Sequence, residues 1–170
     1  MDLSSCIARL RANGAVIVAL ARQLDGDAAR WSPGPEAWSA LEVINHLADE
    51  EAEDFRTRVR ITLSASQDPF PPIDPQGWVT SRDYAGRPMD ASVQRFAFER
   101  AASLGWLLGL GAVDLSAVQV HPVFGSIRAG DLLAAWVDHD LHHMRQLVEL
   151  QHGWWARVVP PFEAGYAGDW

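Results

Sequence analysis

The sequence predicts an all-α protein, a four-helix bundle that forms a single domain over residues 1–170. Four segments of roughly 20 residues carry apolar side chains at spacings of three and four, the period of an amphipathic helix. Proline and glycine clusters separate these segments. No stretch alternates apolar and polar residues over a useful length, so we expect only brief extended pieces, near residues 118–120.

The first two helices are separated by Gly26 and a segment rich in proline. Apolar residues at helical spacing predict the first helix over residues 3–24, with Gly26 breaking it. Ser39 and Glu42 have the spacing of a capping box, in which each side chain accepts a hydrogen bond from the other residue's backbone. The second helix is therefore expected to begin near Ser39 and to run to about residue 63.

Two irregular links are expected in the second half of the chain. The first covers residues 64–88 and contains several prolines and glycines; a connection this long is usually functional or mobile. A third helix should follow over residues 90–110, then the second link over residues 110–128. The fourth helix is predicted over residues 129–152, with Gly153 ending it.

Composition argues against several classes of partner. The net charge is −8 and the pI is near 5.1, which disfavours nucleic acid and anionic membranes. No apolar run approaches the roughly 20 residues of a membrane span.

The single cysteine, Cys6, excludes a disulfide within the chain, so we expect a cytoplasmic protein in which Cys6 is a small buried hydrophobe. Eight tryptophans indicate an aromatic core or pocket, and the high apolar content favours a homodimer.

The strongest chemical signal lies in the fourth helix. His139 and His143 are one turn apart on the face that also carries Trp136 and Leu147, so both imidazoles should point toward the core. Two imidazoles at this spacing can clamp one metal ion. A pair of core histidines with hydrogen-bond partners is an equally good reading of this segment alone. His142 falls on the polar side and is expected to be solvated.

His46 and Glu50 are the candidates on the second helix. His46 lies at the edge of the apolar arc and is a possible third ligand, although a lone histidine there is more often structural. Glu50, one turn further on, fits a fourth ligand, a proton acceptor or a partner of a ligand. Its alternative reading is a solvated carboxylate within the acidic run 49–54. Asp140 should be buried and bonded to His46, to a tryptophan N–H or to the backbone.

Three segments together resemble the signatures of the DinB-like superfamily. They are WSALEVINHLADE (residues 38–50), HPVFG (residues 121–125) and DHDLHHMRQL (residues 138–147), and the match in order and spacing covers about residues 31–150. The resemblance implies an up-down-down-up bundle, often dimeric. It also implies a nickel or zinc ion held by three histidines, which correspond here to His46, His139 and His143.

The resemblance implies an enzyme without identifying its reaction. Characterised members of this superfamily include S-transferases and isomerases that use the low-molecular-weight thiols bacillithiol or mycothiol, and many others are classed as metal-dependent hydrolases. We therefore expect a thiol-dependent S-transferase acting on a small electrophile. The alternatives are a hydrolase that uses metal-activated water and a non-catalytic bundle that binds a metal or a small ligand.

A catalytic pocket should lie beside the three histidines. Three protein ligands leave coordination positions open, as in catalytic rather than structural sites. The two links are predicted to wall this pocket and to give it a mostly apolar lining. The side chains in question are the aromatics Phe70, Trp78 and Tyr84 on the first link, with His121 and Phe124 on the second. Glu50 is the predicted catalytic proton acceptor.

Overall fold

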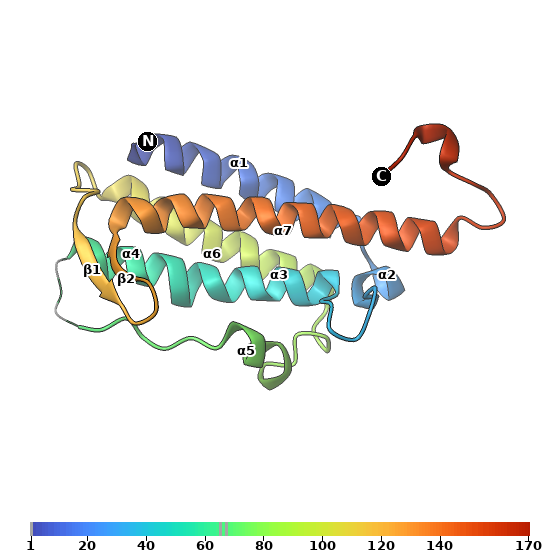
Figure 1. Cartoon of the computed structure of the whole chain (residues 1–170), viewed down its shortest axis with the longest axis horizontal. Helices are drawn as coiled ribbons and strands as arrows, with labels where there is room; N and C mark the ends of the chain where they lie inside the picture. The colour runs from blue at the N-terminus through green and yellow to red at the C-terminus, as the bar shows by residue number, and fades with distance from the viewer. Residues whose placement is uncertain (1, 65, 67) are drawn as a thin grey trace.

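The computed structural model describes residues 2–64, 66 and 68–170, and they form a bundle of long helices (Figure 1). Its helical elements are α1 (Leu3–Ala21), α2 (Gly26–Arg30), α3 (Ala40–Asp49), the π-helix η1 (Glu50–Phe55), α4 (Arg56–Leu63), α5 (Pro75–Ser81), α6 (Met89–Gly109), α7 (Ala129–Val158) and the 3-10 helix η2 (Gly165–Ala167). Strands β1 (Val118–His121) and β2 (Gly125–Arg128) pair in an antiparallel hairpin.

The bundle has the predicted all-α architecture and up-down-down-up topology. α3, η1 and α4 form one continuous rod, which counts as the second bundle helix. α1 and α7 run in one direction, whereas this rod and α6 run in the other (Figure 1). The rod and α6 are consecutive but parallel, so the chain between them must return along the full bundle. α5 lies on this return, within the link that the sequence predicted to be irregular.

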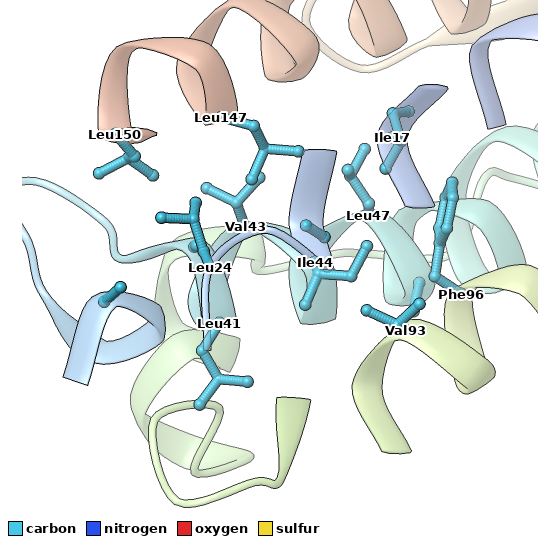
Figure 2. Close-up of a cluster of buried hydrophobic side chains, with 14 residues drawn as sticks. Ile17, Leu24, Leu41, Val43, Ile44, Leu47, Val93, Phe96, Leu147 and Leu150 are labelled. Carbon is cyan, nitrogen blue, oxygen red and sulfur yellow. The ribbon is translucent and has the colours of Figure 1, made fainter. Parts of the chain in front are cut away.

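The hydrophobic core lies between the four bundle helices. Figure 2 shows apolar side chains from α1, α3, α6 and α7 pointing into one shared space. Apolar residues at spacings of three and four produce this arrangement, since they give each helix one apolar stripe. The capping box at the start of α3 is present as predicted: the backbone N–H of Ser39 donates to Glu42 at 2.6 Å, and the Glu42 N–H donates back to the Ser39 hydroxyl at 3.3 Å.

A buried guanidinium ties the helices together. Arg100, on α6, donates to the carboxylate of Glu51 on η1 at 2.8 and 2.9 Å and to that of Asp140 on α7 at 2.7 and 2.9 Å. It also donates to the Leu10 carbonyl on α1 at 2.7 Å. Burial opposes its charge, but the two carboxylates raise the pKa of Arg100 above its usual value. Trp136 adds an N–H to Glu51 at 3.0 Å.

The last helix is longer than the sequence predicted. α7 continues through Gly153 to Val158, so the prediction that Gly153 ends the helix is wrong. The glycine has a packing role instead. A Cβ there would lie 2.6 Å from the Trp31 ring, closer than real Cβ contacts come. Gly153 therefore lets Trp31, in the segment before α3, lie directly against the α7 backbone.

The first helix ends earlier than predicted and is more apolar than the sequence analysis inferred. α1 stops at Ala21, and Gly26 begins the short helix α2. By length and composition α1 meets the criteria for a membrane span, with a mean hydropathy of 1.3 over its best 18-residue window. In the structure it packs against α6 and α7 as a bundle helix. Cys6 is buried on its inner face, which confirms that prediction.

Replacing Arg100 with methionine should destabilise the fold strongly. Glu51 and Asp140 would remain as buried carboxylates without a cation, which costs about 3–5 kcal/mol of unfolding free energy. Urea denaturation measures this loss. Arg9→Met on the exposed face of α1 is the control and should change stability by less than about 0.5 kcal/mol. Adding Glu51→Gln and Asp140→Asn to Arg100→Met should recover most of the loss. An Arg100→Met protein as stable as the control would contradict this account.

Candidate metal centre

The three predicted histidines converge between α3 and α7. His46 comes from α3, and His139 and His143 come from successive turns of α7. The Nε2 atom of His139 lies 3.2 Å from Nε2 of His46 and 3.2 Å from Nε2 of His143. The ligand atoms of all three lie within 4.8 Å of one another. His46 is buried.

This spacing fits the shell of a small divalent ion. Two nitrogens each about 2.0–2.1 Å from zinc and separated by a tetrahedral angle are about 3.3 Å apart. The tautomer of His143 also fits, because its Nδ1 lies 2.8 Å from the Oε1 atom of Gln146, an atom that only accepts. Nδ1 therefore carries the hydrogen, and Nε2 presents a lone pair to the other two rings.

The surroundings keep the imidazoles uncharged, as metal ligation requires. Burial, followed by the nearby charge of His143, lowers the pKa of His46 to about 3. Burial and the other two histidines lower the pKa of His139 to about 2, and burial also lowers the pKa of His143. All three are therefore neutral at pH 7.

Two aromatic rings enclose the cluster. Trp38, just before α3, packs against His46 with ring centroids 4.8 Å apart and stacks nearly parallel to His143 at 6.4 Å. Phe55, at the end of η1, packs against His139 at 5.1 Å. These contacts restrict the rings of all three histidines, so the nitrogens are held in position by packing.

A row of buried polar side chains leads away from His46 along the second bundle helix. Its members recur every four residues and are His46, Glu50, Asp54, Arg58 and Thr62, each at most 9% exposed. In a regular α-helix, residues four apart drift by about 40° per step around the axis. The wider turn of η1 offsets part of this drift and keeps the row on one face. This row is not among the residues predicted from the sequence, although its fixed spacing of four is visible there.

Four of the five acidic residues in the run 49–54 are buried and only Glu53 is exposed, so the reading of the run as a solvated segment is wrong for most of it. Asp49 is fully buried and accepts hydrogen bonds from Tyr84 and Arg95. The Nη1 atom of Arg82 also lies 2.8 Å from the Oδ2 atom of Asp49. Although burial opposes ionisation, these bonds keep the pKa of Asp49 below its ordinary value. Tyr84 lies on the long link, so Asp49 fastens that link to α3.

Glu50 is also buried, without a comparable set of partners. Among the described residues, its Oε1 atom has no hydrogen-bond partner. Burial and the neighbouring charge of Asp54 raise the pKa of Glu50 to about 8. The carboxyl group therefore carries a proton at neutral pH in the protein alone. A cation at the histidines would favour the carboxylate and lower this pKa.

Asp140 and His142, the other two residues of α7 with a predicted position, differ in burial. Asp140 is fully buried, as predicted, but its partner is Arg100 rather than His46, a tryptophan or the backbone. Burial raises the pKa of Asp140 above its usual value, although Arg100 opposes this effect. His142 lies on the exposed side, 3.1 Å from Asp138, which confirms its predicted position.

A cavity of ≈ 610 Å³ lies beside this cluster rather than around it. Phe70, His121 and Phe124 line it, as the sequence predicted for the pocket, but none of the three histidines does. Trp78 and Tyr84 are elsewhere: Trp78 packs under Arg82 with its ring centroid 4.0 Å from the guanidinium carbon, and Tyr84 bonds Asp49. Phe55 connects the two regions, since it lines the cavity and contacts His139.

Metal content should depend on His46, His139 and His143 individually. Alanine at any one of them removes a third of the protein ligands, so metal per chain should fall sharply in elemental analysis of protein purified without a histidine tag. His142→Ala is the matched control on the same helix and should retain the wild-type content. Unchanged stoichiometry in all three single variants would contradict the assignment.

Comparisons with known proteins agree with this geometry. The sequence profile of the DinB superfamily matches residues 9–147. The fold is similar to that of YfiT from Bacillus subtilis, described as a probable metal-dependent hydrolase with an unusual four-helix bundle topology. That similarity has a TM-score of 0.76 at 20% identity and covers 88% of this chain and 86% of YfiT.

A second solved structure, the four-helix bundle protein TT2238, is similar at a TM-score of 0.57 and 19% identity, covering 87% of this chain and 99% of that one. Among curated proteins, none matches the sequence significantly. The profile match spans most of the chain and includes all three histidines. Together with the shared bundle fold, it shows that this chain belongs to the DinB superfamily.

Proposed function

We propose that this protein is a divalent-metal-dependent enzyme acting on a small molecule, with the ion held by His46, His139 and His143. One observation carries the proposal: three neutral imidazoles from α3 and α7 turn their nitrogens toward one point. Nickel and zinc are the expected metals. Both accept imidazole ligands.

A bound ion would supply Lewis-acid chemistry, lowering the pKa of a coordinated water or thiol. The donor set favours catalysis over a purely structural role, because structural sites usually fill four positions with protein ligands. The chain brings only three of its His, Cys, Asp and Glu ligand atoms together at this point among the described residues. Substrate or water would complete the shell.

Glu50 is the residue we assign to proton transfer. It lies one turn from His46 and is buried, and burial raises its pKa to about 8 in the protein alone. A cation at the histidines would lower this pKa toward neutral pH, where the carboxylate can act as a general base. Asp54, the next member of the row, raises that pKa and so makes the carboxylate a stronger proton acceptor. The role of Glu50 is to hold the proton that a water or thiol gives up.

The proposed reaction is transfer of a low-molecular-weight thiol to a small electrophile, and hydrolysis is the second candidate. The resemblance to thiol-dependent transferases supports the first. The second is supported by the fold shared with YfiT, described as a probable metal-dependent hydrolase. Both need the same metal ligands and the same proton acceptor, so they differ only in the nucleophile. A cytoplasmic homodimer remains a prediction of the sequence.

The nucleophile can be identified with the cobalt-substituted protein. Adding bacillithiol, mycothiol, glutathione or cysteine should shift its visible d–d bands and add near-ultraviolet charge-transfer bands, because the thiolate becomes a cobalt ligand. The His139→Ala variant is the control and should show no such shift. A spectrum that none of the four thiols changes, together with turnover of p-nitrophenyl acetate, would contradict the transferase proposal and support the hydrolase. A silent spectrum with no turnover would indicate a binding protein.

Glu50→Gln should lower turnover without removing the metal. The amide cannot accept the proton, and general-base catalysis contributes roughly 10²–10⁴-fold. The measurement is kcat with whichever nucleophile the cobalt experiment identifies, alongside metal content. Glu149→Gln, on the exposed face of α7, is the control and should behave as wild type. Unchanged turnover in Glu50→Gln with metal retained would remove Glu50 from the mechanism.

A further inference from the structure

The cavity beside the metal centre has the size and position of a small-molecule site. Its volume of ≈ 610 Å³ falls within the roughly 300–1,000 Å³ typical of ligand pockets. It lies at the end of the bundle that the β1–β2 hairpin covers (Figure 1). Its walls come from η1, α4, the start of α7, the hairpin and residues 70–73 of the long link.

The walls are mainly aromatic and aliphatic. Phe55, Phe70, Ile127 and Leu132 contribute from four different segments, and three prolines stiffen the surrounding chain. Because proline fixes its backbone φ angle, this part of the wall needs little ordering when a ligand enters. Such a surface favours a ligand with a flat or bulky apolar body.

The cavity carries no net charge at neutral pH. Its charged lining residues are Asp54 and Arg58, which form an ion pair with each other and are 9% and 6% exposed. His121 is uncharged, because burial and Arg58 lower its pKa. Its Nδ1 atom also accepts N–H groups from Val123 at 3.0 Å and Phe124 at 3.2 Å. A charged ligand would lose its hydration here without meeting an unpaired opposite charge.

Apolar surface at the rim is left for a ligand to cover. Val123 and Phe124, at the hairpin turn, line the cavity but are 78% and 74% exposed. The rim is fixed in place, since His121 packs against Phe124 at 4.9 Å and against Phe70 at 5.7 Å. These contacts hold the hairpin and the long link together around the opening.

At its inner end the cavity is separated from the metal centre by the ring of Phe55. Phe55 forms part of the cavity wall and packs against His139. Ala135 also lines the cavity and precedes His139 by one turn of α7. A ligand seated against Phe55 therefore has one aromatic ring between it and a proposed metal ligand.

We propose that this cavity binds an uncharged, largely apolar small molecule with an aromatic or similarly bulky body. Its role as the substrate pocket of the metal centre rests on the proposed function, whereas the binding itself does not. The main rival is an anionic ligand held by Arg58, whose Nη1 atom is buried without a hydrogen-bond partner among the described residues. The pairing of Arg58 with Asp54 argues against it.

Two fluorescent probes with the same ring system distinguish these ligand classes. N-phenyl-1-naphthylamine is neutral, and 8-anilino-1-naphthalenesulfonate adds one negative charge. In fluorescence titrations the neutral probe should bind at least about tenfold more tightly than the anionic one, because the wall offers no free countercharge. Tighter binding of the sulfonate, lost in Arg58→Gln, would overturn the proposal in favour of an anion site.

Two variants on adjacent α7 positions locate the binding. Ala135→Phe places a ring in the cavity from an exposed helix position and should weaken binding of the neutral probe at least about tenfold. Ala134→Phe, exposed but outside the cavity lining, should leave binding within about twofold. Phe124→Ala tests the rim independently and should weaken binding severalfold. Equal affinity in wild type, Ala135→Phe and Phe124→Ala would overturn the assignment.

His139→Ala separates this inference from the proposed function. It removes a proposed metal ligand outside the cavity lining, so neutral-probe binding should persist while metal content falls. If wild-type protein binds the probe in the cavity but binds no metal, the proposed function fails and the cavity assignment stands. If metal binds at the histidines but Ala135→Phe leaves probe affinity unchanged, the cavity assignment fails alone.

Discussion

Arg100 donates from α6 to groups on the other three helices of the bundle, and the position of the histidines depends on these bonds. Glu51 directly follows Glu50, a member of the row that begins at His46, and Asp140 directly follows His139. The guanidinium therefore fixes both segments that present ligands. Because a buried cation is stable only when its partners are in place, the network favours one register of α7 against η1.

The π-helix connects the fold to the site. η1 lies between the part of the second bundle helix that carries His46 and the part that carries Arg58. The π-helix has more residues per turn, so it reduces the angular drift between residues four apart. Polar groups at this spacing can therefore remain buried between the histidines and the cavity. This arrangement places His46, Glu50 and two residues that line the cavity, Asp54 and Arg58, along one helix face.

The local features of the fold could be predicted from the sequence. The capping box at Ser39, the extent of α6 and the inward faces of His139 and His143 follow from residue type and helical period, and the structure agrees. The packing role of Gly153 could not be predicted, since the ring that lies against it belongs to Trp31, more than a hundred residues earlier. The partner of Asp140 was missed for the same reason: Arg100 is brought to it only by packing.

Burial of most of the acidic run also could not be predicted from the sequence. A segment dense in carboxylates is typical of a solvated surface, and no local pattern reveals that arginines and Tyr84 from later segments will neutralise it. Conversely, the spacing of four from His46 to Thr62 was visible in the sequence and would have indicated a buried polar face. The cavity depends on chain segments far apart and could be predicted only as a pocket near the links.

X-ray absorption spectroscopy of the zinc- or nickel-loaded protein tests the central claim most directly. If His46, His139 and His143 bind the ion, the spectrum will show multiple scattering from three imidazole rings, with metal–nitrogen distances of about 2.0–2.1 Å for zinc, and oxygen or sulfur ligands completing the shell. A spectrum without imidazole scattering, or with one ring only, would contradict the proposal that α3 and α7 together form the metal centre.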